Sequence, residues 1–166
     1  MCNQIDPKAL DANVFGKLAD DWALVTAGTA DRCSTMTVSW GGMGVLWGKP
    51  VATIYIRPQR YTKEFIDREP RFTLAFFGPE QHKNLQFCGS RSGRDVDKVS
   101  ECGFTVRAEN GAPYFEEAQL VLVCRKLYAQ RFDPACFIDK GLDGQNYPQK
   151  DYHEMYVGEI ETILKK

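Results

Sequence analysis

A basic, hydroxyl-rich turn follows an apolar segment in the first half of the chain. It holds Arg57, Arg60, Tyr61 and Thr62 within six residues. Phosphate groups are bound by guanidinium forks, hydroxyl donors and free backbone N–H groups. Thr62, near an expected helix start, offers a hydroxyl beside helix-terminal amides. The turn predicts either a phosphate site or a solvated turn whose arginines pair with acidic side chains of the next segment.

A second segment of interest precedes this turn and combines small, aromatic and glycine residues. It contains Met36, Thr37, Val38, Ser39 and Trp40, followed by three glycines in positions 41–44. Glycines let backbone amides approach a flat ligand closely. Flavin chemistry needs donors near the ring edge, where charge builds up on reduction. The segment predicts either a site for a planar ring or a glycine turn with tryptophans in the core.

A third, charged segment runs from residue 88 to residue 98. Ser92, Gly93, Arg94 and Lys98 give it donors and backbone freedom, and two aspartates lie among them. One interpretation is that it contributes to an anion site, for the FMN phosphate or for a nicotinamide cofactor. The other is a mobile surface loop whose charges neutralise one another. The first two segments together suit FMN, which has a flat ring at one end and a phosphate at the other.

Other catalytic chemistries have little support in the sequence. The two histidines, His82 and His153, have no neighbouring triad partners. A hydrogen-bonded surface position is expected for His153, and contact with a ligand or a subunit interface is the alternative. The six cysteines form no Cys-x-x-Cys pair and no zinc-like spacing, so no metal site is predicted. Cys33 and Cys88 are expected to be structural. Reduced thiols and the lack of a signal peptide at the start indicate a cytoplasmic protein.

Many short strands separated by Gly and Pro must position these segments. Expected strands cover residues 22–26, 33–40, 50–56, 71–77, 104–107, 114–116, 119–131 and 152–164, and expected helices cover 7–21, 61–68 and 80–88. A glycine break is expected at 41–44, a turn at Asn110–Gly111, and irregular chain at 133–148. This pattern favours a closed barrel or sandwich over a parallel α/β sheet.

Length and composition define the class of protein. The 166 residues predict one domain, residues 1–166, and 43% hydrophobic with 26% charged residues is ordinary for a globular chain. The formal net charge is −1. This balance gives no sign of nucleic-acid binding, and no apolar stretch has the length needed to cross a membrane. An anion site must therefore be a local cluster.

Taken in order, these segments resemble the flavin reductase-like FMN-binding split-barrel family, in particular its flavoredoxin-like branch. The resemblance covers nearly the whole chain from about residue 22, and it rests on segments 36–41, 46–50, 55–62, 92–98, 117–118 and 156–160. It implies a mainly β fold, a six-stranded antiparallel split β-barrel with short flanking helices. It also implies a homodimer with FMN near the interface.

The resemblance assigns roles to the three segments. It implies that residues 37–40 line the isoalloxazine ring. It implies that the phosphate is held by Arg57, Arg60, Tyr61 and Thr62. The segment 92–98 would lie near the flavin, with Lys98 or Arg94 adding a phosphate contact. The expected function is NAD(P)H-dependent reduction of flavin at N5, with NADH or NADPH as donor and no catalytic side chain. The alternatives are an electron carrier serving a redox protein partner, a barrel that has lost flavin, and a barrel for haem or another flavin.

Overall fold

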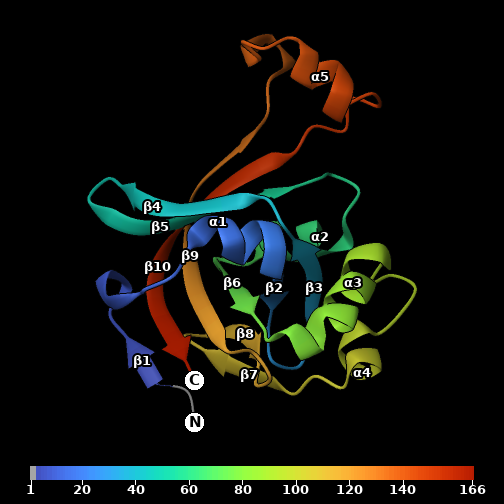
Figure 1. Ribbon diagram of the computed structural model, residues 1–166. Helices are drawn as coiled ribbons and strands as arrows, with labels where there is room; N and C mark the ends of the chain where they lie inside the picture. The colour runs from blue at the N-terminus through green and yellow to red at the C-terminus, as the bar shows by residue number, and fades with distance from the viewer. Residues whose placement is uncertain (1–2) are drawn as a thin grey trace.

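The computed structural model describes residues 3–166, so Cys2 lies outside the described residues (Figure 1). The strands are β1 (Asn3–Ile5), β2 (Ala23–Gly28), β3 (Cys33–Val38), β4 (Gly41–Leu46), β5 (Lys49–Ile56), β6 (Arg71–Phe76), β7 (Val106–Glu109), β8 (Ala112–Phe115), β9 (Leu120–Arg131) and β10 (Glu154–Lys165). The helical segments are η1 (Pro7–Ala9), α1 (Val14–Gly16), η2 (Lys17–Asp21), α2 (Tyr61–Arg68), η3 (Pro79–Gln81), α3 (His82–Ser90), α4 (Lys98–Cys102), η4 (Pro134–Cys136) and α5 (Gly141–Asn146).

Eight of the strands form one antiparallel sheet that curls on itself. Seven follow the order β3-β2-β6-β9-β10-β5-β4, and β1 pairs with β10. β3 and β4 lie at opposite ends of this order, yet only Ser39 and Trp40 connect them. The three Cα-to-Cα steps from Val38 to Gly41 span at most about 11 Å. The two ends of the sheet must therefore come together at this link, and β7 and β8 form a separate hairpin.

The curled sheet is packed on both faces, as the side chains of β9 show. Leu120, Leu122 and Cys124 belong to one hydrophobic cluster, and Val121 and Val123 belong to a second. Side chains alternate between the faces of a strand, so the first cluster fills the inside of the barrel. The second lies under α3, α4 and the β7–β8 hairpin, which cover the outside of the sheet (Figure 1).

A glycine allows β10 to bend as it passes between β5 and β9. The register with β9 shifts between Val157 and Gly158. A Cβ added at Gly158 would lie 2.8 Å from the Cβ of Cys124 and 2.8 Å from the ring of Phe72. A bulge of this kind bends a strand and increases its twist. Gly158 therefore lets the sheet curl without displacing the aromatic core beneath it.

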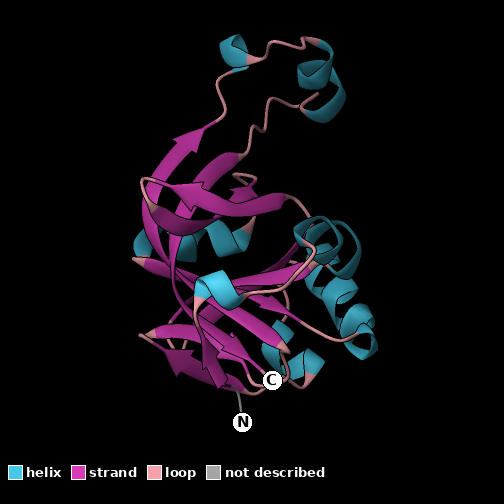
Figure 2. Ribbon diagram, turned by 60° about the vertical axis from the view of Figure 1, so that its left-hand side comes forward, coloured by secondary structure: helices cyan, strands magenta, loops and turns pink. Residues whose placement is uncertain are grey.

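An arm formed by residues 132–153 projects from the barrel between β9 and β10 (Figures 1 and 2). Its side chains form a small aromatic cluster, in which the rings of Tyr147 and Tyr152 lie 5.0 Å apart and those of Phe137 and Tyr147 lie 5.9 Å apart. Irregular chain was predicted here. That prediction was wrong in part, because η4 and α5 lie within the arm.

Most of the predicted elements are confirmed. The fold is mainly β, helix α2 covers residues 61–68, and the helical pattern around Val14 corresponds to α1 and η2. Asn110 and Gly111, with φ of 51° and 78°, form the predicted turn of the β7–β8 hairpin. Positive φ at both central residues is typical of a tight hairpin turn.

Two expectations about the sheet were wrong. Residues 41–44 were predicted to break the chain, but they form the first part of β4, with Gly41 opposite Ile54 and Gly44 opposite Val51. A Cβ at Gly41 would lie 2.6 Å from the carbonyl oxygen of Thr53, so glycine permits a close pairing here. The main sheet also has eight strands, not six, because β1 and β4 join it.

No helix within residues 3–166 has both the length and the apolar character needed to span a membrane.

Candidate functional site

Two adjoining cavities lie where β3, the β3–β4 link and the start of α2 meet. Cavity A, about 200 Å³, is lined by residues 36–40, Tyr55, Arg57, Arg60 and His153. Cavity B, about 160 Å³, is lined by Met36, residues 59–62, residues 90–93 and Lys98. The two share Met36 and Arg60. Together they reach the lower end of the ~300–1,000 Å³ typical of small-molecule sites.

The structure brings together twelve of the thirteen residues predicted to bind the cofactor. Cavities A and B are lined by Met36, Thr37, Val38, Ser39, Trp40, Arg57, Arg60, Tyr61, Thr62, Ser92, Gly93 and Lys98. The segments predicted to bind the ring and the phosphate thus line two adjoining cavities that share Met36 and Arg60. Arg94 is the exception, and it lies outside both cavities.

Carbonyl groups near the end of α3 hold three of these side chains in place. The Thr37 hydroxyl donates to the carbonyl of Leu85. Arg60 donates from Nη2 to the carbonyl of Gly89 at 2.9 Å. Lys98 donates from Nζ to the carbonyl of Cys88 at 2.7 Å and to that of Thr35 in β3 at 2.9 Å. One stretch of helix therefore positions donors on β3, α2 and α4.

The three nearby cations differ in their partners. Arg57 pairs with Asp151 at 2.6 Å and lies 5.1 Å from the ring centre of Tyr147, so its charge is already balanced. Within residues 3–166, no carboxylate pairs with Arg60 or Lys98, whose hydrogen bonds go to backbone carbonyls. Lys98 is only 6% exposed. Two half-buried or buried cations therefore face cavity B without a counter-ion from the described part of the chain.

Burial affects the protonation of both cations. It lowers the pKa of Arg60, and it lowers the pKa of Lys98 to about 8, with the Arg60 charge also contributing. A charged group taken out of water without an opposite charge favours its neutral form. An anion bound in cavity B would supply that opposite charge.

Hydroxyl and backbone groups complete cavity B. Thr62 is buried, and its Oγ1 lies 3.0 Å from the Oγ of Ser34, with either atom able to donate. Helix α2 begins at Tyr61 with no side chain capping its N-terminal amides. A Cβ at Gly93 would lie 2.9 Å from the Tyr61 ring, so glycine lets residues 91–93 approach α2 closely. Free amides at a helix start favour an anion.

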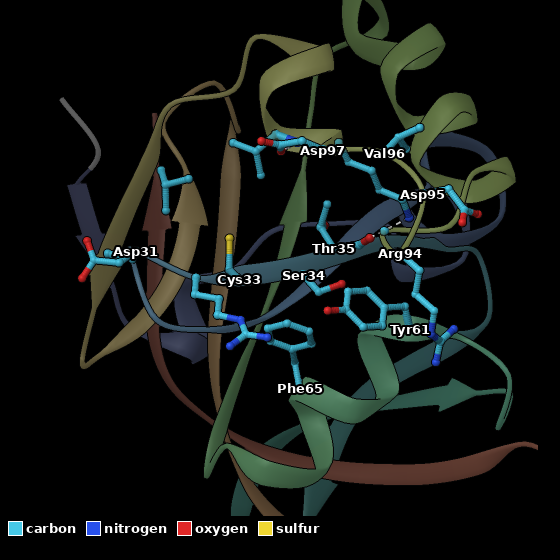
Figure 3. A pocket seen from close by; sticks show the side chains of 16 residues that line it. Asp31, Cys33, Ser34, Thr35, Tyr61, Phe65, Arg94, Asp95, Val96 and Asp97 are labelled. Carbon is cyan, nitrogen blue, oxygen red and sulfur yellow. Dashed lines mark hydrogen bonds between the residues drawn. The ribbon is translucent and has the colours of Figure 1, made fainter.

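A further cavity is lined by both Arg94 and Tyr61 (Figure 3). The Arg94 guanidinium forms an ion pair with Glu64 and lies 4.8 Å from the ring centre of Tyr61. This cavity, about 490 Å³, shares Tyr61, Gly93 and Lys98 with cavity B. Residues 92–98 are therefore divided: Arg94 is neutralised at the surface, whereas Lys98 is buried at the site.

Cavity C, about 750 Å³, opens beside cavity A. It shares Ser39, Trp40, Tyr55 and His153 with cavity A. Its remaining walls come from α1 and η2, the start of β4, and the arm, and they are mainly apolar. Trp40 is 52% exposed and its ring lies 5.5 Å from that of His153. The alternative that Trp40 and Trp47 belong to the core is wrong, since Trp47 is also 61% exposed.

The arrangement combines an anion-binding end with a flat, partly aromatic end. Cavity B offers cations, a hydroxyl and helix-terminal amides, and cavity A offers a wall of β3 and the link. No group of three or more His, Cys, Asp or Glu side chains in residues 3–166 is placed to hold a metal ion.

The comparison with protein families decides which class of protein this is. The model of the flavin reductase like domain matches residues 15–164. The chain belongs to the flavin reductase-like family. No curated protein matches the chain.

Solved structures agree with this membership at the level of the fold. Flavoredoxin from Methanosarcina acetivorans is 21% identical, with a TM-score of 0.71 over 95% of this chain and 76% of that one. The FMN-binding protein from Thermus thermophilus, with bound 1-cyclohex-2-enone, is 21% identical, with a TM-score of 0.69 over 94% and 78%. The Streptomyces globisporus NADH:FAD oxidoreductase, in complex with NAD and FAD fragments, is 18% identical, with a TM-score of 0.65 over 88% and 74%. These similarities confirm the split-barrel fold class.

Sequence reasoning missed several residues of this flavin reductase-like site. His153 was expected at the surface, but it is 7% exposed, and its Nδ1 lies 2.8 Å from the Tyr147 hydroxyl. Tyr55 also lines cavity A. Alternation along β5 could have placed Tyr55 beside Arg57, two residues on. No local pattern identifies His153, because β10 brings it to the site from far along the chain.

The buried position of His153 predicts a loss of stability in acid. Burial, and secondarily the Arg57 charge, lowers the pKa of His153 from 6.5 to about 4. The unfolded chain therefore binds a proton between these values that the folded protein does not. The buried neutral His153 therefore makes its full contribution to the free energy of unfolding above pH 6.5. This contribution, at most about 3 kcal/mol, is lost as the pH falls towards 4.

Urea unfolding of the wild type, His153→Gln and His82→Gln across pH 4–7 checks this prediction. We expect a shallower acid-side fall in unfolding free energy for His153→Gln than for the wild type. His82 is exposed, so His82→Gln is expected to keep the wild-type profile. An unchanged acid-side slope in His153→Gln would contradict the assignment.

Proposed function

We propose that this flavin reductase-like chain binds FMN across cavities A and B and reduces it with NADH or NADPH. The observation that carries the proposal is the presence of Arg60 and Lys98 at one end of an elongated cavity, with no carboxylate partner in the described chain. Buried charges are normally paired. A phosphate group supplies the missing partner.

In this proposal cavity B holds the phosphate. Arg60 offers a guanidinium, Lys98 an ammonium with one hydrogen left after its two bonds to carbonyls, and Thr62 a hydroxyl. Ser92 and Gly93 contribute a hydroxyl and an approachable backbone. Arg57 has a supporting role, since its ion pair with Asp151 anchors the arm beside cavity A.

Cavity A holds the ring. Thr37, Ser39 and the backbone around Trp40 present polar groups along one wall, and Met36 and Val38 present apolar ones. When bound, FMN would supply the redox chemistry, hydride transfer at its N5 atom, and no side chain would be required as an acid or base. The protein binds the cofactor, orients it and excludes water from part of its surface.

The donor has room beside the ring. Cavity C adjoins cavity A through four shared residues and is large enough, at about 750 Å³, for a second flat molecule. This apolar space supports direct reduction by a nicotinamide. The alternative is a flavoredoxin-like electron carrier that keeps FMN bound and exchanges electrons with a redox protein partner.

An anaerobic visible spectrum tests the function. We expect purified protein with FMN to lose its oxidised flavin bands on addition of NADH or NADPH, faster than FMN in free solution does. FMN with each nucleotide alone is the control. A bound flavin spectrum that neither nucleotide bleaches would contradict the reductase and favour the electron carrier.

Substitution of Arg60 tests the phosphate assignment. Removing one charge-assisted contact costs about 1.5–3 kcal/mol, so Arg60→Ala should weaken FMN binding about 10- to 100-fold. Arg107→Ala is the control, because Arg107 pairs with Glu116 on the β7–β8 hairpin, away from the site. Titrating flavin fluorescence measures both affinities, and equal affinity in Arg60→Ala and the control would rule out the assignment. Retained circular dichroism shows that the variants fold.

We also propose a homodimer with FMN near the interface. Two large apolar side chains that line cavity C are exposed, Phe15 at 87% and Leu142 at 44%, and Ile138, which follows the lining residue Phe137, is 99% exposed. Exposed apolar side chains gathered in one region are of the kind that marks protein contacts. A second copy of the chain would cover these side chains and form a further wall of cavity C, leaving its opening to cavity A free.

Sedimentation equilibrium checks the homodimer. We expect about twice the chain mass of 18.8 kDa for the wild type, and a monomer for the double variant Phe15→Glu/Ile138→Glu. Val45→Glu is the control, since Val45 is 77% exposed on the β4–β5 hairpin and does not line cavity C. A monomeric wild type at micromolar concentration would refute the dimer.

A further inference from the structure

Two cysteine thiols are in contact beside the candidate site. Cys88 in α3 is fully buried, Cys102 at the end of α4 is half-buried, and their sulfur atoms are 3.7 Å apart. Across residues 3–166, no other two cysteine sulfurs lie within hydrogen-bonding distance. Cys88 was expected to be structural, and no role was predicted for Cys102. The surroundings of the pair indicate a more specific role.

Both cysteines are directly connected to the groups that face cavity B. The carbonyl of Cys88 accepts the 2.7 Å hydrogen bond from Lys98, and the carbonyl of the next residue, Gly89, accepts from Arg60. Lys98 and Cys102 are the first and last residues of α4. A change in the distance between Cys88 and Cys102 therefore acts on Lys98 and Arg60, the two cations that have no carboxylate partner among the described residues.

We propose that Cys88 and Cys102 form a reversible disulfide that weakens binding of the FMN phosphate in cavity B. The inference rests on the proposed function for its effect on FMN, but the formation of the disulfide does not. The pair is an oxidative modification site, and the oxidant is a peroxide.

The reaction balances with hydrogen peroxide as oxidant. Cys102, the more exposed of the two, attacks one peroxide oxygen. The O–O bond breaks, one water leaves and Cys102 becomes a sulfenic acid. The Cys88 sulfur then attacks the Cys102 sulfur, the S–O bond breaks and a second water leaves. Two thiols lose two electrons and two protons in total, and one S–S bond forms. A dithiol reductant reverses the step by exchange.

Forming the disulfide requires the two sulfur atoms to move together, and this movement would change the positions of the side chains in cavity B. A disulfide has an S–S length of about 2.05 Å, so the sulfurs must approach by roughly 1.6 Å. Lys98 is held by two hydrogen bonds of 2.7 and 2.9 Å to carbonyls on different elements, α3 and β3. Hydrogen bonds weaken steeply outside a narrow range of length and angle. The disulfide is therefore expected to displace Lys98 or Arg60 from cavity B.

The environment keeps the reduced pair as the resting form. Burial raises the pKa of Cys88 to about 12 and also raises the pKa of Cys102, so few thiolates are present at neutral pH. Since the thiolate is the nucleophile, the first step is slow. Contact between the sulfurs makes the second step intramolecular once Cys102 has reacted. The pair responds to sustained peroxide and is insensitive to brief exposure.

The test uses the full chain with and without hydrogen peroxide. Free thiols are alkylated, and mass spectrometry of the digested protein maps any Cys88–Cys102 link. Affinities for FMN and for riboflavin, which lacks the phosphate, are measured on the same samples. Cys102→Ser removes the pair, with Cys102→Ala as a second variant if the first folds poorly. Cys136→Ser is the control, because Cys136 is exposed on the arm.

We expect the link in the wild type and in Cys136→Ser, with FMN affinity falling at least fivefold, riboflavin affinity unchanged, and both effects reversed by dithiothreitol. Cys102→Ser should keep its FMN affinity after peroxide treatment. Absence of the link, or a link with unchanged FMN affinity, overturns the inference. Reduced protein that binds no FMN overturns the proposed function instead, and the mass spectrum still decides whether the disulfide forms.

Discussion

The two-residue connection between β3 and β4 is the constraint on which the rest of the structure depends. These strands occupy opposite ends of the sheet order, so a link of only Ser39 and Trp40 forces the sheet to curl until its ends meet. Closure leaves few exposed strand edges, which favours a monomeric core over edge-to-edge association. It also places the link between cavities A and C, because Ser39 and Trp40 line both. The fold and the candidate site therefore have a common geometric origin.

The second organising feature is the use of carbonyl groups in place of carboxylates. Cys88 and Gly89, in the last turn of α3, accept hydrogen bonds from Lys98 and Arg60, and Leu85, in the middle of the helix, accepts one from Thr37. The C-terminal end of a helix has a partial negative charge, which favours cations without fully neutralising them. Arg60 and Lys98 are thus fixed in position but keep the ability to attract an anion. A carboxylate in the same place would hold them equally well and would compete with a phosphate.

Local pattern was enough to predict the parts of the fold that depend on neighbouring residues. Pro58 and the hydroxyl of Thr62 mark the start of α2, and β-branched and aromatic residues mark β5, so both elements were predicted closely. Pattern failed at Gly41 and Gly44, because glycine usually interrupts strands and only the pairing with β5 shows that it permits close approach here. Twelve residues that line cavities A and B were predicted because they cluster in three segments, whereas Tyr55 and His153 were missed. Arg94 and Lys98 are four residues apart but have different positions in the structure. Arg94 pairs with Glu64 at the surface, and Lys98 is held at the site by the carbonyl of Cys88, and neither partner could be predicted from neighbouring residues.

The projecting arm has its own aromatic cluster, separate from the two clusters that pack the barrel. Its attachment to the barrel is narrow and includes the Arg57–Asp151 ion pair and the hydrogen bond from the Phe132 amide to the His153 carbonyl, 2.9 Å long. Segments with few contacts to the main core open at a lower free energy than the whole protein unfolds. We therefore expect the arm to open as a separate cooperative unit, and cavity A lies on the boundary between it and the barrel. Amide hydrogen exchange around cavity A is then governed by the opening of the arm. The amides around cavity B, at the other end, are expected to exchange only with the much rarer unfolding of the barrel.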